Sequence, residues 1–242
     1  MKHLISLLAF SLLIGCDGEK SNEPTNPNLK YKIKGDAVTI TGRATGASGE
    51  LIIPAMIEGK PVTKIEEEAF LLCTNLTSIT IPDSVTSIGE DAFSRCNSLK
   101  SITIPDSITH IGARAFAGTP TVFTEVENIN FLLGREGKRA YLIDGSQASG
   151  AINLPTMVGG AEVSLISDSA FSNCTGLTSI NIPDSVTSIG SSAFGECTSL
   201  TTIEVSAGNV NYTVVEGVLF NMEMTLLHTY LGGKAGANYV IP

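Results

Sequence analysis

The chain has 242 residues, and 43% of them are hydrophobic, which excludes a disordered protein and allows a sizeable core. Acidic residues outnumber basic ones by 24 to 15, so the formal net charge is -9 and no basic run stands out. Because binding to phosphates requires clustered cations, and because Trp is absent and aromatics make up only 6% of the residues, a nucleic-acid partner is disfavoured.

The first segment has the pattern of a secretory signal peptide. A cationic start, Met1-Lys2-His3, precedes an apolar stretch from Leu4 to Ile14 and then Gly15. This stretch is shorter than the roughly 20 residues that a helix needs to cross a bilayer, which argues against a permanent membrane span. Residues 1–15 are therefore predicted to be a cleaved leader.

The leader runs into Leu13-Ile14-Gly15-Cys16, which resembles the lipobox of bacterial lipoproteins. The resemblance implies acylation of the Cys16 sulfur, and membrane attachment through this lipid anchor only. A soluble secreted protein with an incidental cysteine is the alternative. Residues 16–29 are polar, contain Pro24 and Pro27, and lack the apolar side chains of a core, so they are predicted to form a flexible tether.

A unit of 23 residues recurs along the rest of the chain. Its first clear copy begins at Leu76 and reads LTSITIPDSVTSIGEDAFSRC; the apolar positions return from Leu99 and again from Leu177. A longer period of 101 residues relates Phe70 to Phe171, so the array is internally duplicated. One unit cannot bury enough apolar surface to offset its ordering entropy, so units must stack as a solenoid.

Each unit has a simple internal order. Leu-x-x-Ile-x-Ile predicts a short strand with inward isoleucines, and the following proline ends it because proline has no N–H for the ladder. Val-x-x-Ile predicts a second extended segment, after which a glycine such as Gly89 is expected to allow a sharp bend. The spacing of Ala-Phe-x-x-Cys predicts a short helical turn that packs inward.

Hairpins are predicted between groups of units. Gly35-Asp36 lies between two alternating segments and suits a tight turn, and residues 130–154 and 212–241 resemble each other as β-hairpin spacers. The predicted solenoid therefore covers residues 30–242. Its blocks lie at about 30–128 and 129–211, followed by a spacer or incomplete block at 212–242.

The unit resembles the leucine-rich repeat of bacterial BspA-like surface proteins, whose consensus places Ile-Pro, Val-x-x-Ile-Gly, Ala-Phe and Cys in this order. The resemblance extends from Leu51 to Val205, with Glu66 and Ser167 in place of glycine in the first unit of each block. It implies an α/β solenoid: a right-handed curved array of short strands, short helical turns and β-hairpin spacers. It also implies a place in the bacterial cell envelope, at the outer membrane or cell surface, and a role in adhesion.

The outward positions of the main strands form a hydroxyl-rich face with little charge. Such a face can bind a protein or an extended polymer through hydrogen bonds over a broad area. A solvated sheet whose threonines merely favour strands is the alternative. The candidate ligand-binding residues are Thr77, Thr80, Lys100, Thr103, Thr178, Asn181, Thr202 and Glu204.

Reactive side chains recur at fixed positions of the unit. The cysteines invite a disulfide or a metal in an exported protein, but small buried core thiols are the simpler interpretation, and no neighbouring ligands support zinc. The aspartates could attract Ca²⁺ or a basic partner, although turn capping explains them more simply. These residues are Cys73, Cys96, Cys174 and Cys197, and Asp83, Asp106 and Asp184.

No convergent set of acid, base and nucleophile is visible, since neither His110 nor His228 has an evident partner in the repeats. The sequence therefore predicts no enzyme, no cofactor and no metal. The predicted function is a non-catalytic cell-surface binding module for adhesion or for recognition of a protein or polymer. The alternative is a structural or accessory subunit of a bacterial envelope complex.

Overall fold

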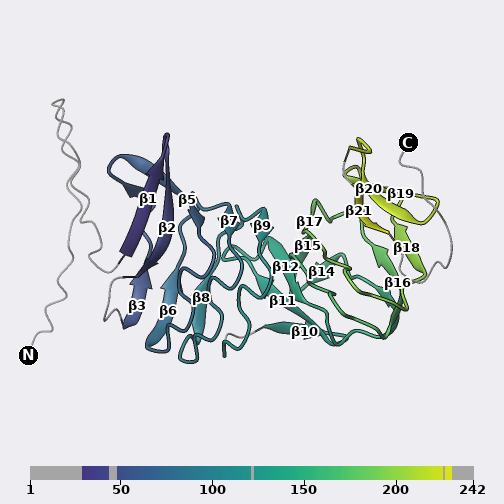
Figure 1. Cartoon of the computed structure of the whole chain (residues 1–242), viewed down its shortest axis with the longest axis horizontal. Helices are drawn as coiled ribbons and strands as arrows, with labels where there is room; N and C mark the ends of the chain where they lie inside the picture. The colour runs from purple at the N-terminus through teal and green to yellow at the C-terminus, as the bar shows by residue number, and fades with distance from the viewer. Residues whose placement is uncertain (1–28, 44–47, 121–122, 226, 231–242) are drawn as a thin grey trace, which may run out of the picture.

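The computed structural model describes residues 29–43, 48–120, 123–225 and 227–230. The predicted leader, the lipobox cysteine Cys16 and the tether up to residue 28 lie outside these ranges. Within them, no helix is long and apolar enough to span a membrane. Successive coils of the chain stack side by side along the long axis of the molecule (Figure 1).

Strands and turns make up two blocks with a similar order of elements, followed by an antiparallel sheet of three strands. The first block contains β1 (Leu29–Lys34), β2 (Ala37–Arg43), β3 (Gly49–Ile52), β4 (Met56–Ile57), β5 (Lys60–Ile65), β6 (Leu76–Thr80), β7 (Ser87–Ile88), β8 (Ser101–Thr103) and β9 (His110–Ile111). The second contains β10 (Thr124–Val126), β11 (Ile129–Leu133), β12 (Arg139–Asp144), β13 (Gly150–Asn153), β14 (Met157–Val158), β15 (Ala161–Ile166), β16 (Leu177–Ile182), β17 (Ser188–Ile189) and β18 (Thr202–Val205). The chain continues into β19 (Tyr212–Val215), β20 (Val218–Asn221) and β21 (Leu227–Tyr230).

Each block has two parallel ladders. The main strands pair in the orders β3-β6-β8 and β13-β16-β18, and the second ladders run β2-β5-β7-β9 and β12-β15-β17. The hairpins β1–β2, β11–β12 and β19–β20 are antiparallel. Equal positions of neighbouring coils lie opposite one another, as Ile79 does with Ile102, because both coils carry the same residue pattern. The predicted leucine-rich-repeat solenoid is therefore confirmed.

The Ala-Phe-x-x-Cys segments differ from the sequence-based expectation, because they form turns and not helices. The N–H of Phe70 donates to the carbonyl of Ala92 in the next coil at 2.8 Å, and Leu71 donates within its own turn to Glu68 at 3.0 Å. Glu68 and Leu72 have left-handed φ values of 56° and 57°, whereas an α-helix needs consecutive right-handed residues. The described residues thus form a β-solenoid, which corrects the predicted α/β class and its short helical turns.

The glycine of the unit has a different role from the expected bend. Gly112 has no left-handed φ, but a Cβ placed on it would lie 2.4 Å from the nitrogen of Glu90 in the preceding coil. Glycine is therefore needed for close approach between coils. Where Glu66 and Ser167 replace it, the ladder continues: their N–H groups donate to the carbonyls of Ile40 and Leu142 at 2.8 and 2.9 Å.

Phenylalanine rings of successive coils stack in the core, as the repeat predicts. The centroids of Phe70 and Phe93 are 5.2 Å apart, and those of Phe93 and Phe116 are 5.5 Å apart. In the second block, Phe171 stacks on Phe194 at 5.4 Å. All five rings are buried, so the apolar rungs form an elongated core.

A buried amide closes the second block. Asn209 donates from Nδ2 to the carbonyls of Pro183 and Val186 at 2.8 and 3.1 Å. Its Oδ1 accepts from the N–H groups of Asn211 and Tyr212 at 2.8 and 3.0 Å. One side chain thereby joins the last main turn to the hairpin β19–β20.

Replacing Asn209 with alanine is expected to lower the free energy of unfolding by about 2–4 kcal/mol, because buried backbone groups lose their partners. Urea denaturation followed by far-ultraviolet circular dichroism measures this change. The matched control is Asn75→Ala, since Asn75 is exposed and should be close to neutral. Equal losses in the two variants would contradict the role of the amide.

Candidate binding surface

The outward face of the first block consists of two rows that cross its three main strands. Glu50, Ser78 and Ser101 lie opposite one another in one row. Ile52, Thr80 and Thr103 form the other, while Ile79 and Ile102 lie between them on the inner face. The register therefore places Thr80 and Thr103 side by side, as the sequence predicts.

The second block repeats this arrangement with different side chains. Ala151, Ser179 and Thr202 form one row, and Asn153, Asn181 and Glu204 form the other. Among the predicted site residues, Asn181 and Glu204 are thus neighbours, and Thr202 lies beside Ser179. We call these two outward surfaces, on β3-β6-β8 and on β13-β16-β18, the strand face.

Three further candidates lie at the edge of this face. Gly49 pairs with Leu76 and Glu50 with Ser78, so Thr77 is the extra residue of a β-bulge; Thr178 occupies the same place in the second block. Thr77 and Lys100 are adjacent, because the N–H of Lys100 donates to the carbonyl of Thr77 at 3.0 Å. The eight candidates therefore fall into two groups, one in each block, on separate sheets.

The sequence-based candidates omit the first strand of each sheet. Glu50 and Ile52 on β3, and Asn153 on β13, extend the rows, and the Ile52 side chain is 57% exposed. These strands lack the full repeat motif. Their only clear signal is an apolar residue followed by proline at Pro54 and again 101 residues later at Pro155.

The four repeat cysteines are buried free thiols in the structure. Cys96 Sγ donates to the carbonyl of Phe70 in the preceding coil at 3.0 Å, and Cys197 Sγ makes the same contact with Phe171 at 3.0 Å. The interaction of the neighbouring thiols of Cys73 and Cys96 lowers the pKa of Cys73 and raises that of Cys96. Within the described ranges, no three His, Cys, Asp or Glu side chains gather as metal ligands.

Burial raises the pKa of the Cys197 thiol to about 11 and also raises that of Cys174. Folding therefore favours the protonated thiols, and this stabilisation is present below the ordinary pKa of 9.0 and lost as the pH rises towards 11. We expect the free energy of unfolding to fall over this interval. Urea titrations under reducing conditions should show a shallower fall for Cys197→Ala, and identical slopes would contradict the assignment.

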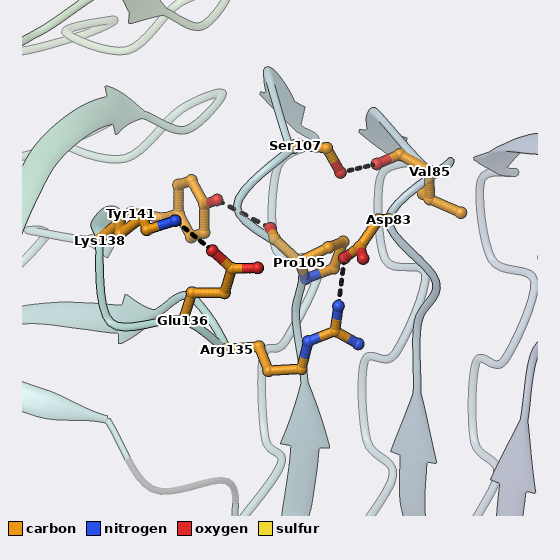
Figure 2. A network of polar contacts seen from close by, with 8 residues as sticks. All are labelled: Asp83, Val85, Pro105, Ser107, Arg135, Glu136, Lys138 and Tyr141. Carbon is orange, nitrogen blue, oxygen red and sulfur yellow. Dashed lines mark hydrogen bonds and ion pairs between the residues drawn. The ribbon is translucent and has the colours of Figure 1, made fainter.

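One of the repeat aspartates, Asp83, contacts a basic side chain of the next block (Figure 2). The guanidinium of Arg135, between β11 and β12, forms an ion pair with Asp83, and the backbone N–H of Arg135 donates to the carbonyl of Ile104 at 2.7 Å. The buried Tyr141 hydroxyl donates to the carbonyl of Pro105 at 2.9 Å. These contacts fasten the hairpin of the second block to the first block.

His110 lies at the same junction. Its Nε2 is 3.6 Å from Oδ2 of Asp168, and its side chain is 46% exposed. Asp168 Oδ1 already accepts from the N–H of Ser191 at 2.8 Å, and Ser188 donates from its hydroxyl to the carbonyl of Thr109 at 2.9 Å. These are contacts between blocks. The side chain of His228 lies outside the described part of the chain.

Comparison with known proteins identifies the repeat. A family model described as "BspA type Leucine rich repeat region" matches residues 57–131 and 146–227 in 6 copies, which is well over half of the chain. No curated protein matches the chain.

Several solved structures are similar to parts of the chain. A leucine-rich repeat protein of T. pallidum shares 26% identity over 73% of this chain and 68% of its own, with a TM-score of 0.41. A leucine-rich cell surface protein from Faecalibacterium prausnitzii shares 27% identity over 88% of this chain and 59% of its own, with a TM-score of 0.39. A leucine-rich repeat protein from Bacteroides ovatus shares 28% identity over 73% of this chain and 45% of its own, with a TM-score of 0.42. The chain thus spans between 45% and 68% of these relatives.

Proposed function

The chain belongs to the BspA-type leucine-rich repeat family, and on this premise we propose that it is a non-catalytic binding module that recognises a protein or an extended polymer through the strand face. Repeat arrays of this kind bind macromolecules over an extended surface. Adhesion at the cell surface is the role we propose for this binding.

The in-register rows of polar side chains are the observation that carries this proposal. Ser78, Thr80, Ser101 and Thr103 occupy matching positions on β6 and β8, and each hydroxyl can both donate and accept a hydrogen bond. Neutral hydroxyls are easier to remove from water than charged groups. Ile52, at the end of one row, adds an exposed apolar contact.

The proposed location follows from the sequence. Acylation of Cys16 would fix the chain to a membrane of the bacterial cell envelope, at the outer membrane or cell surface. The flexible tether predicted at residues 16–29, whose last residue lies in β1, would then hold the solenoid roughly 20 Å from the lipid. In this arrangement the strand face is free to meet a partner.

The full chain, bound to an immobilised panel of host matrix proteins and bacterial surface components, tests the proposal. The double variant Thr80→Arg/Thr103→Arg should weaken the binding by more than about 10-fold, because two large cations would replace neighbouring hydroxyls in one row of the face. The matched control is Thr86→Arg/Thr187→Arg, which changes exposed threonines outside the main strands.

Absence of binding to every member of the panel at micromolar concentration would contradict the proposal, as would equal losses in the two double variants. Co-purification from membranes with one stoichiometric membrane protein would instead assign the chain to an envelope complex as an accessory subunit.

A further inference from the structure

A cavity of about 510 Å³ lies at the junction of the two blocks. One wall is the last Ala-Phe turn of the first block, at residues 114–119. The opposite wall is the first Ala-Phe turn of the second block, at residues 168–173, and residues 143–146 lie between them. This volume is in the range of ordinary ligand sites, which is about 300–1,000 Å³.

The cavity exists because one turn of the stack is short. Residues 66–75 separate β5 from β6, but only residues 145–149 separate β12 from β13. The short turn carries no phenylalanine, so it cannot extend the row of rings. Phe116 accordingly ends one stack of rings, and Phe171 begins the other.

The wall at residues 114–119 presents three backbone donors. The N–H groups of Arg114, Phe116 and Gly118 have no hydrogen-bond partner within the described ranges. In the preceding coil, the equivalent groups donate forward to carbonyls of the next coil. Those bonds join Asp91 to Ala113 at 3.0 Å, Phe93 to Ala115 at 2.8 Å, and Arg95 to Ala117 at 2.7 Å.

The opposite wall presents backbone acceptors. The N–H of Gly145 in the short turn donates to the carbonyl of Ala170 at 2.8 Å. The carbonyls of Asp168 and Ser172, on either side, accept no hydrogen bond from the described residues, whereas the equivalent carbonyls of Ala113 and Ala117 accept from Asp91 and Arg95 of the preceding coil. The two walls therefore lack one rung of main chain between them, and a peptide backbone offers the groups that both walls require.

The side chains around the cavity select the kind of peptide. The carboxylates of Asp144 and Asp168 line it, while the guanidinium of Arg114 is held by Glu90 at 2.7 Å and Asp91 at 2.6 Å. Half-buried Phe123 and Ile143 supply apolar surface. A segment with a basic side chain next to an apolar one complements this lining.

We propose that this cavity binds a short basic peptide segment of another protein. Its main-chain carbonyls accept from Arg114, Phe116 and Gly118, and its cationic side chain meets Asp144 and Asp168. The site is separate from the strand face, so the chain has two recognition surfaces with different chemistry.

A displayed library of random octapeptides, selected on the full chain, tests this proposal. A selected peptide, made synthetically, should slow amide hydrogen exchange at Arg114, Phe116 and Gly118. Ser146→Trp, at the mouth of the cavity, should weaken its binding by at least about 10-fold. The matched control is Ser149→Trp, on the same turn and exposed but outside the cavity lining, which should change the affinity less than about twofold.

Three results would overturn the proposal: no peptide is selected, the three amides exchange at unchanged rates with peptide bound, or they are already protected in the free chain because its own residues fill the cavity. The variant Thr80→Arg/Thr103→Arg should retain peptide binding. This variant therefore distinguishes a wrong proposal for the strand face from a wrong proposal for the cavity.

Discussion

Gly112→Ala is expected to lower the free energy of unfolding by about 3 kcal/mol or more, at the upper end of what overpacking costs. The new Cβ would lie 2.4 Å from the nitrogen of Glu90 and 2.6 Å from the carbonyl carbon of Gly89. Both are backbone atoms of the preceding coil, so no rotamer change relieves the clash. The coils must separate, which weakens the adjoining bond from the Gly112 N–H to the Ile88 carbonyl.

Thermal and urea denaturation of Gly112→Ala measure this loss, and hydrogen exchange should place it between the coils that carry β7 and β9. Gly208→Ala is the matched control, because a Cβ there meets only the side chain of Asp184, at 3.1 Å, which can move. A Gly112→Ala protein as stable as the control would show that the coils can separate without cost.

Phe93→Ala is expected to lower the free energy of unfolding by about 3–5 kcal/mol, the usual range for deleting a buried aromatic ring. Phe93 is the middle ring of three, with Phe70 at 5.2 Å and Phe116 at 5.5 Å, so its removal takes contacts from both neighbours. Since its side chain is fully buried, the space left behind lies within the core and is closed to water. Urea denaturation and the loss of exchange protection in the neighbouring coils measure the effect.

Phe194→Ala is the comparison for this experiment. Among the described residues, Phe194 stacks only on Phe171, at the end of its row. Its replacement should therefore lower the free energy of unfolding by less than that of Phe93. Similar losses at the two positions would mean that stacking on a second neighbour adds little, and that burial of each ring alone sets the stability.

The strands and the core could be predicted from the sequence because their signals are local and repeated. Alternating isoleucines such as Ile79 and Ile81, followed by Pro82, define a strand and its end, and the recurrence of Phe70 as Phe93 aligns the rings. The same alignment predicts that Thr80 lies beside Thr103, and the register of β6 and β8 confirms it.

The turns could not be predicted in the same way. Glu68 and Arg95 adopt left-handed φ values that neither residue type favours, because hydrogen bonds to the next coil hold them there. From the sequence, Gly112 is expected to provide backbone flexibility for a bend. The structure shows that a glycine is needed there because the backbone of the neighbouring coil lies too close for a Cβ. The cavity depends on the number of residues between β12 and β13. It becomes visible only when the short turn at residues 145–149 lies between the turns at residues 114–119 and 168–173.

Every regular coil contacts the next one in the same way, through a row of isoleucines, backbone hydrogen bonds and a close approach at the position of the glycine. Insertion or loss of a whole unit therefore joins equivalent positions, whereas a change of any other length shifts all later side chains out of step. Recombination between repeats of the gene can alter the reach of such a protein in discrete increments while each increment remains foldable. The number of coils in such an array can therefore change, whereas the spacing between its coils cannot.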